Sequence, residues 1–181
     1  MESGAYYHVY NRGVNRETIF KEAKNYPYFL LKYDQYLSPV VDTFCYCLMP
    51  NHFHFFVRIK EDCEDGAVIK AFKDFFISYA KSINKGYDRT GSLFQSKFKK
   101  KEIDSDAYYS MIIAYIHLNP LRASLVSSIA DWKYSSYPAI VSHAPTKVCR
   151  KEVIEWFGGH KAFVDFHQSF DDGSEAKSVL Y

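Results

Sequence analysis

Two strand-forming runs separated by a turn constrain this chain more than any other feature. The segment VVDTFCYCLMPNHFHFFVRI occupies residues 40–59, and β-branched and aromatic residues dominate both sides of its Met-Pro-Asn step. Such side chains favour strands, and a short turn containing proline and asparagine suits a connection between antiparallel neighbours. The segment therefore predicts a hairpin with strands at 40–48 and 52–59.

The remaining sequence adds strands and helices on both sides of this hairpin. The predicted elements are strands at 5–11, 40–48, 52–59 and 96–103, helices at 21–37, 65–84 and from 104 or 105 to about 119, and two short helices at 150–157 and 160–169. The first six follow the βαββαβ order of a ferredoxin-like fold, in which an antiparallel sheet carries its helices on one face. The sequence thus predicts an α+β protein of this type with added C-terminal helices and one sheet face free for a ligand.

Length and composition limit the number of domains and the cellular setting. A chain of 181 residues suffices for one well-buried domain, which we expect to span residues 1–170, with residues 171–181 as a flexible tail. The four cysteines lack a C-x-x-C pair, and no apolar run is long enough for a membrane helix. These features predict a cytoplasmic protein without a membrane segment. The formal charge of +2 permits a nucleic-acid partner where basic residues cluster.

Two histidines interrupt the second strand of the hairpin. Side chains alternate between the faces of a strand, so His52 and His54 share one face and Phe53 and Phe55 point into the core. Two imidazoles on one face can bind a single divalent ion. The same spacing also occurs on solvated or purely structural strand faces, and the spacing alone favours that interpretation.

A later helix, in YSMIIAYIHLNPLRASLV, offers partners for the two histidines. Tyr115 and Asn119 are four residues apart and therefore lie on one helical face, whereas His117 lies on another. The amide oxygen of Asn119 is a hard ligand that suits Mg²⁺ or Mn²⁺. The alternatives are a core or rim position for Tyr115, and for Asn119 a helix-terminal role before Pro120, where the helix is expected to end.

A basic and aromatic segment is the strongest candidate for contact with nucleic acid. In LFQSKFKKK, Phe94 and Gln95 are followed by Lys97 and Lys99, so lysines could bind phosphates and an aromatic ring could stack on an unpaired base. An edge strand protected by lysines would have the same composition. Three arginines outside this segment are further candidates for contact with nucleic acid: Arg12, Arg16 and Arg122.

Taken together, several segments resemble one family of enzymes. MPNHFHFFVRI, GSLFQSKFK and YIHLNPLRASLV, in this order, are similar to motifs of the HUH single-tyrosine transposases, where U is a bulky apolar residue. The similarity is greatest to the REP-associated tyrosine transposase branch, and YYHVYNRGVNRETIF and WKYSSY extend it over roughly residues 5–140. This resemblance implies that Tyr115 is the nucleophile, that His52 and His54 bind the metal, and that Asn119 completes the metal site.

The resemblance also implies a reaction and a partner. The implied enzyme cuts single-stranded DNA at hairpin-flanked sequences with Mg²⁺ or Mn²⁺, forms a 5′-phosphotyrosine, and transfers strands without ATP. Some relatives of this kind act as homodimers and others as monomers. Two alternatives remain open at this point: a non-catalytic ferredoxin-like protein that binds nucleic acid, and a domesticated family member that cuts DNA for its host.

Overall fold

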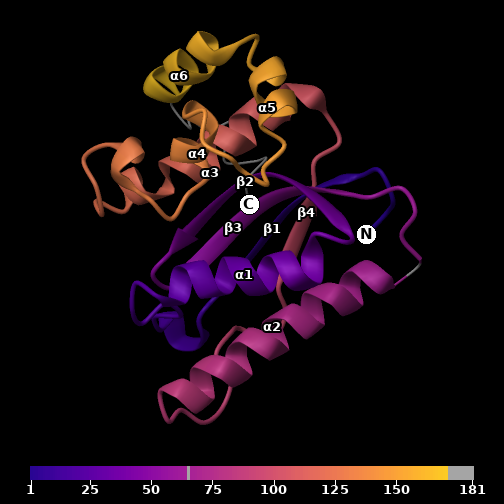
Figure 1. Cartoon of the computed structure of the whole chain (residues 1–181), viewed down its shortest axis with the longest axis vertical. Coiled ribbons are helices and arrows are strands. Elements are labelled where there is room, and N and C mark those ends of the chain that lie inside the picture. The colour runs from indigo at the N-terminus through magenta and orange to yellow at the C-terminus, as the bar shows by residue number, and fades with distance from the viewer. Residues whose placement is uncertain (65, 171–181) are drawn as a thin grey trace.

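The computed structural model describes residues 1–64 and 66–170, which form a four-stranded sheet with helices on both of its faces (Figure 1). The strands are β1 (Tyr6–Arg12), β2 (Val41–Met49), β3 (His52–Ile59) and β4 (Lys99–Glu102). The helices are α1 (Asn25–Leu37), α2 (Ala67–Gly86), α3 (Tyr109–Arg122), α4 (Tyr137–Val141), α5 (Arg150–Trp156) and α6 (His160–Ser169). Three 3₁₀ turns, η1 (Val14–Arg16), η2 (Asp106–Tyr108) and η3 (Ile129–Asp131), complete the described elements. The predicted tail at 171–181 lies outside the described residues.

The sheet has the strand order β2-β3-β1-β4, and each neighbouring pair is antiparallel. This order and the βαββαβ succession confirm the predicted α+β ferredoxin-like fold. Only Pro50 and Asn51 separate β2 from β3, and Met49 pairs with His52, so the predicted hairpin is also confirmed. β1 lies in the middle of the sheet between β3 and β4, which puts the N-terminal strand directly beside the two histidines.

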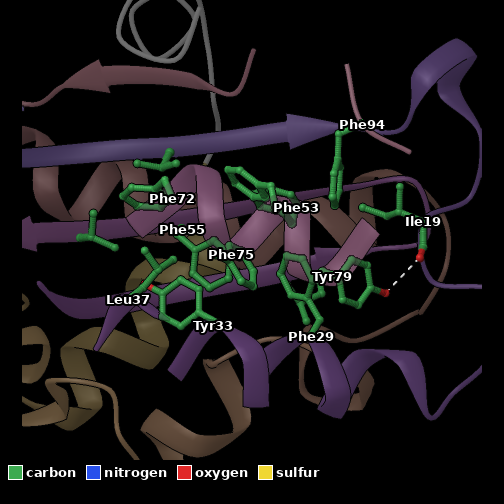
Figure 2. Packing of buried hydrophobic residues seen from close by; sticks show 14 of the residues in the cluster. Ile19, Phe29, Tyr33, Leu37, Phe53, Phe55, Phe72, Phe75, Tyr79 and Phe94 are labelled. Atoms are coloured by element: carbon green, nitrogen blue, oxygen red, sulfur yellow. Dashed lines mark hydrogen bonds between the residues drawn. The ribbon is translucent and has the colours of Figure 1, made fainter. Parts of the chain in front are cut away.

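One face of the sheet packs against α1 and α2. Phe53 and Phe55 of β3 point to this side, as predicted, and both are almost fully buried. Phe29 of α1 meets Phe53 with ring centroids 5.2 Å apart, and the Tyr79 hydroxyl of α2 donates to the Ile19 carbonyl at 3.1 Å (Figure 2). Burial of such aromatic surface is the main stabilising contribution to the fold.

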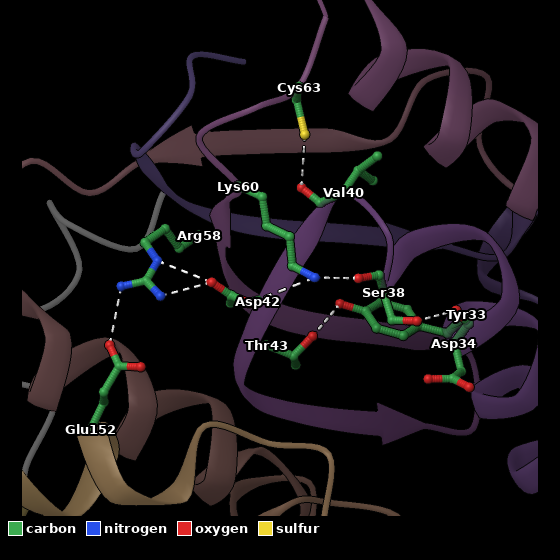
Figure 3. Close-up of polar contacts among 10 residues, drawn as sticks. All are labelled: Tyr33, Asp34, Ser38, Val40, Asp42, Thr43, Arg58, Lys60, Cys63 and Glu152. Carbon is green, nitrogen blue, oxygen red and sulfur yellow. Dashed lines mark hydrogen bonds and ion pairs between the residues drawn. The ribbon is translucent and has the colours of Figure 1, made fainter.

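The other face is covered by α3 and the helices that follow it (Figure 1). Phe44 and Phe56 point to this side and pack with Ile112 and Ile116 of α3 in a second buried cluster. The expectation that this whole face stays free is therefore wrong, because its apolar strand residues require a cover. An ion-pair network adds to the attachment: Arg58 contacts Asp42 at 2.7 Å and Glu152 of α5 at 3.1 Å (Figure 3).

Two predicted boundaries differ from the structure. β4 contains only four residues, fewer than the predicted strand at 96–103, because the chain from Gly91 to Phe98 is bent and irregular apart from an isolated bridge at Phe94. α3 begins at Tyr109 and continues through Pro120 to Arg122, so the prediction that it ends near Asn119 is wrong. Among the described helices, none has both the length and the apolar character that crossing a membrane requires.

Candidate active site

Two adjacent central strands place five polar or aromatic side chains on one face of the sheet. In the β1–β3 register, Tyr10 pairs with His54 and Arg12 with His52, and His8 lies two residues before Tyr10 on the same face. The rings of His52 and His54 lie 5.2 Å apart, centroid to centroid. The prediction that both histidines share a face opposite the aromatic core is confirmed by this arrangement.

The helix α3 brings the predicted tyrosine and asparagine to the same place. The Tyr115 ring lies edge-on to His54, with 5.7 Å between ring centroids, and Asn119 lines the same cavity as His52. A cavity of about 210 Å³ opens between these groups. Its lining consists of Tyr10, Asn11, Arg12, His52, His54, Gln95, Lys99, Tyr115 and Asn119. Side chains far apart in the sequence thus form one composite site.

Asn119 has a local reason to present its oxygen to this cavity. Its Nδ2 donates to the Tyr115 carbonyl at 2.9 Å and approaches the Ile116 carbonyl at 3.5 Å. The Ile116 carbonyl is the group that would accept from residue 120, where proline has no N–H. The amide nitrogen therefore compensates for Pro120 inside α3, and the side-chain oxygen is the atom left for a ligand.

Asn51, in the hairpin turn, orients the first histidine. Its Oδ1 accepts from His52 Nδ1 at 2.7 Å, and its Nδ2 donates to the Arg16 carbonyl at 3.1 Å. Because Oδ1 only accepts, His52 carries its proton on Nδ1 and its lone pair on Nε2. The Arg16 end of this link is itself unusual, since Asn15 and Arg16 both have positive φ, at 52° and 63°.

His8 plays the corresponding part for the second histidine, although it is not among the site residues predicted from the sequence. Its Nε2 lies 2.8 Å from His54 Nδ1, and its side chain is 1% exposed. The other ring nitrogen of His8, Nδ1, is buried without a hydrogen-bond partner among the described residues. The signal available in the sequence was the YHVY alternation of the first strand, which places His8 on the same strand face as Tyr10 and Arg12.

Burial keeps all three imidazoles neutral. Desolvation lowers the pKa of His8 to about 3, with a smaller contribution from Lys101. Desolvation and then Arg12 lower the pKa of His52 to about 4. The pKa of His54 lies well below its usual value, first through burial and then through His8, His52 and Arg12. Near neutral pH these rings therefore have the unprotonated nitrogen that a metal ligand needs.

The donor set fits a small divalent cation. His52 and His54 supply imidazole nitrogens and Asn119 an amide oxygen, a combination that suits Mn²⁺ and tolerates Mg²⁺ when water or substrate fills the other positions. Within residues 1–64 and 66–170, no three His, Cys, Asp or Glu side chains are placed to hold a metal ion. His8 lies behind His54 and hydrogen-bonds to it, so it supports the pair and does not add a third imidazole.

The predicted nucleic-acid contacts divide between several environments. Arg12, Gln95 and Lys99 line the cavity, whereas Arg16 lies on an exposed turn outside that lining. The Arg122 guanidinium lies over the Tyr115 ring, 5.5 Å from its centroid. Lys97 lines a different depression, between α2 and the segment that precedes β4.

Phe94 does not occupy the predicted position. Its ring is 6% exposed and packs in the core with Phe53, Phe76 and Tyr79 (Figure 2). Because so little of the ring is exposed, Phe94 cannot stack face-on with an unpaired base, and that prediction is wrong. The apolar residues around it belong to the sheet–helix core, which the local pattern LFQSKFK could not indicate.

Comparisons with known proteins identify similar sequences and a similar fold. The profile of the family described as "Transposase IS200 like" matches residues 2–119. A Haemophilus influenzae protein named "Putative REP-associated tyrosine transposase" is 26% identical over 103 residues, which cover 53% of this chain and 58% of that relative.

A solved structure described as a REP-associated tyrosine transposase bound to a REP hairpin has the same fold. It superposes with a TM-score of 0.65 over 80% of this chain and 84% of that structure, at 16% identity. The family profile extends over β1, both histidines of β3, and Tyr115 and Asn119 of α3. The chain therefore belongs to the IS200-like transposase family, a family of enzymes.

Proposed function

We propose that this protein is a metal-dependent endonuclease and strand transferase that acts on single-stranded DNA at hairpin-flanked sequences. One observation carries the proposal: Tyr115, two neutral histidines and the Asn119 side chain surround a single cavity with basic residues at its edge. Family membership supports the transposase reaction, and the similar solved structure, which is bound to a REP hairpin, supports a DNA hairpin as partner.

The proposed metal ligands are His52 Nε2, His54 Nε2 and the Asn119 side-chain oxygen. Bound Mg²⁺ or Mn²⁺ would polarise the scissile phosphate and stabilise the negative charge that develops on the departing oxygen. For His54 to present its lone pair on Nε2, the Nδ1 proton must be donated to His8. His8 and Asn51 then act as positioning residues that hold both histidines in the same tautomer.

Tyr115 is the proposed nucleophile. Its phenol oxygen attacks phosphorus, the bond from phosphorus to the 3′-oxygen breaks, and the products are a 5′-phosphotyrosine and a 3′-hydroxyl. The phenol loses a proton to water and the 3′-oxygen gains one, so one phosphodiester replaces another. The Arg122 guanidinium over the ring places a positive charge beside the attacking group. A second 3′-hydroxyl can later displace Tyr115, which rejoins strands without a nucleotide cofactor.

The basic residues of the cavity orient the DNA backbone in this proposal. Arg12 and Lys99 supply cations that bind phosphate oxygens, and Gln95 supplies an amide at the boundary of the cavity. Lys99 pairs with Tyr10 in the sheet and its ammonium group lies 5.9 Å from the Tyr10 ring centroid, which places it on the cavity side of β4. Such phosphate contacts are sequence-independent and weaken as salt rises.

The proposal is tested by trapping the covalent intermediate. The full chain is incubated with a labelled single-stranded hairpin oligonucleotide and Mn²⁺, and a protein–DNA adduct that survives denaturing electrophoresis is quantified. Wild type should form the adduct and Tyr115→Phe should form none, because phenylalanine lacks the attacking oxygen. Tyr108→Phe is the matched control, since Tyr108 is an exposed tyrosine outside the cavity lining.

Two results would contradict this function. An adduct from Tyr115→Phe equal to that of wild type would exclude Tyr115 as nucleophile. Binding of a range of hairpin oligonucleotides by wild type, with no adduct in any of them, would favour the alternative of a non-catalytic ferredoxin-like nucleic-acid-binding protein.

A further inference from the structure

A second depression lies beside the proposed active site, at the β4 edge of the sheet and on the face that α1 and α2 cover. It has a volume of about 570 Å³, within the range of about 300–1,000 Å³ that is usual for ligand pockets, and runs between α2 and the segment from Gly91 to Lys100. We name this depression the α2 groove. Its walls include Ile69, Lys73 and Ile77 from α2, and Lys97, Phe98 and Lys100 from the opposite side.

The α2 groove combines an apolar floor with a cationic rim. Ile77 is 52% exposed although it is a large aliphatic residue, and Phe98 is only partly buried where it packs on Phe72 and Phe76. Lys73 and Lys97 are exposed at the rim, and none of the described residues that line the groove is acidic. This composition matches a ligand with flat apolar groups joined by anionic links, which is the chemistry of unpaired nucleotides.

The α2 groove adjoins the active-site cavity. Asn11 and Gln95 line both depressions and form the boundary between them. The Gln95 N–H donates to the Arg12 carbonyl at 2.9 Å, which fixes this boundary to the central strand β1. β4 is the edge strand, and no further described strand lies beyond it to block a path between the two depressions.

The lysines of the 97–100 segment divide between these two sites. Lys99 lies on the cavity side, near the Tyr10 ring, whereas Lys100 lies on the opposite side, 5.6 Å from the Tyr7 ring centroid. This alternation follows from the pleat of β4. A strand of DNA that crosses the edge at Gln95 would therefore meet a cation on each side.

From these observations we propose that the α2 groove binds unpaired nucleotides adjoining the scissile phosphate. Bases lie against Ile77 and Phe98, and Lys73 and Lys97 bind the phosphates between them. This inference rests on the proposed function, because it takes the cavity as the place where single-stranded DNA is cut. It adds a second binding site that sets how much single strand the enzyme requires.

Affinity for oligonucleotides with and without a flank tests the proposal. A labelled hairpin is prepared alone and with six unpaired nucleotides on its 5′ or 3′ side, and Kd is measured by fluorescence anisotropy in EDTA, where no cleavage occurs. Wild type should gain at least about tenfold in affinity from one of the flanks, since each stacked base contributes roughly 1–3 kcal/mol. The double variant Lys73→Glu/Lys97→Glu should lose this gain.

A charge-matched control separates the groove from general electrostatics. Lys151→Glu/Lys161→Glu makes the same change in net charge at exposed lysines on α5 and α6 and should keep the flank-dependent gain. The proposal is overturned if wild type shows no gain from either flank, or if both double variants lose it equally. It is also overturned if light scattering shows that Lys73→Glu/Lys97→Glu breaks a dimer while the gain persists, because the groove would then join two copies of this chain.

The failure of this proposal is distinguishable from failure of the proposed function. The binding measurement does not depend on covalent chemistry, whereas the adduct assay uses a hairpin oligonucleotide with Mn²⁺. If the adduct forms but affinity does not rise with a flank, only the proposed nucleotide site in the α2 groove is overturned. If affinity rises with a flank but no adduct forms, the proposed cleavage reaction is overturned and the α2 groove is still a binding site for single-stranded DNA.

Discussion

Two buried histidine pairs, on different sides of α3, differ in how completely their hydrogen bonds are satisfied. In one pair, His117 Nδ1 lies 2.9 Å from His167 Nε2, and the outer nitrogens reach Ser136 Oγ at 2.8 Å and the Phe163 carbonyl at 2.8 Å. In the other, His8 Nε2 lies 2.8 Å from His54 Nδ1, but His8 Nδ1 has no partner among the described residues.

The His117–His167 pair, called the closed pair because each of its ring nitrogens has a partner, has one consistent arrangement of protons. The Phe163 carbonyl can only accept, so His167 carries its proton on Nδ1 and accepts at Nε2 from His117. His117 then accepts at Nε2 from the Ser136 hydroxyl, whose oxygen accepts the Tyr46 N–H at 2.9 Å. Every ring nitrogen is used, and the chain of bonds joins α3 to α6 and to β2. Such a pair stabilises the fold.

The His8–His54 pair, called the open pair, has no such partner at His8 Nδ1 and lies beside the active-site cavity. Its arrangement leaves a buried nitrogen unsatisfied on His8, and native structures tolerate this where function requires it. The comparison teaches that burial and a lowered pKa do not distinguish a functional histidine from a structural one, because both pairs have both properties. The unsatisfied hydrogen-bonding capacity beside Tyr115 distinguishes them.

The largest expected effect is on the closed pair. His117→Ala leaves His167 Nε2 and the Ser136 hydroxyl buried without their partner, and each orphaned group costs about 1–3 kcal/mol. We expect the free energy of unfolding to fall by about 2–4 kcal/mol in urea denaturation. His143→Ala, at an exposed histidine, is the control and should change it by less than about 0.5 kcal/mol. Equal values for the two variants would show that the network does not stabilise the fold.

The open pair should respond in metal affinity more than in stability. His8→Leu removes the acceptor that orients His54, and loss of such a supporting partner typically weakens metal binding about 10–100-fold. We expect this loss in Mn²⁺ affinity measured by calorimetry. His8→Gln offers an amide oxygen near the position of Nε2 and should restore part of it. If His8→Leu binds Mn²⁺ as wild type does, His8 does not position His54.

Acidification gives the smallest difference between variants. Burial lowers the pKa of His167 to about 4, so between the unfolded value of about 6.5 and pH 4 the unfolded state binds more protons than the folded state. The contribution of His167 to the free energy of unfolding therefore falls as pH decreases through this window and is constant above it. His167→Gln keeps an acceptor for His117 but does not titrate there. Its slope should be smaller by up to about 1.4 kcal/mol per pH unit in urea denaturation at stepped pH. Identical slopes would contradict the assignment.

Alternation and helical spacing predicted which of the site's side chains share a face within one strand or one helix. The period of two placed His52 and His54 on one face, and the four-residue spacing placed Tyr115 and Asn119 on another element with His117 turned away. These periods fix side-chain direction within an element, and the family resemblance supplied the pairing between elements. The role of each group as ligand or nucleophile stays a prediction.

Other features depend on contacts that no local pattern contains. The burial of Phe94 depends on α2, and the continuation of α3 through Pro120 depends on the Asn119 side chain bonding to two carbonyls. The link from His8 to His54 needs the β1–β3 register, which couples residues 46 positions apart in the sequence. The sheet face was expected to be free because the sequence does not show where the C-terminal helices pack.

The central claim is that the open histidine pair, and not the closed one, belongs to a metal centre. Electron paramagnetic resonance of Mn²⁺ titrated into the full chain measures this directly. We predict one bound Mn²⁺ in wild type and in His167→Gln, with at least about 100-fold weaker binding in His54→Ala, because a ligand contributes more than a supporting partner. Equal Mn²⁺ binding by wild type and His54→Ala, or no Mn²⁺ bound by wild type, would contradict the account.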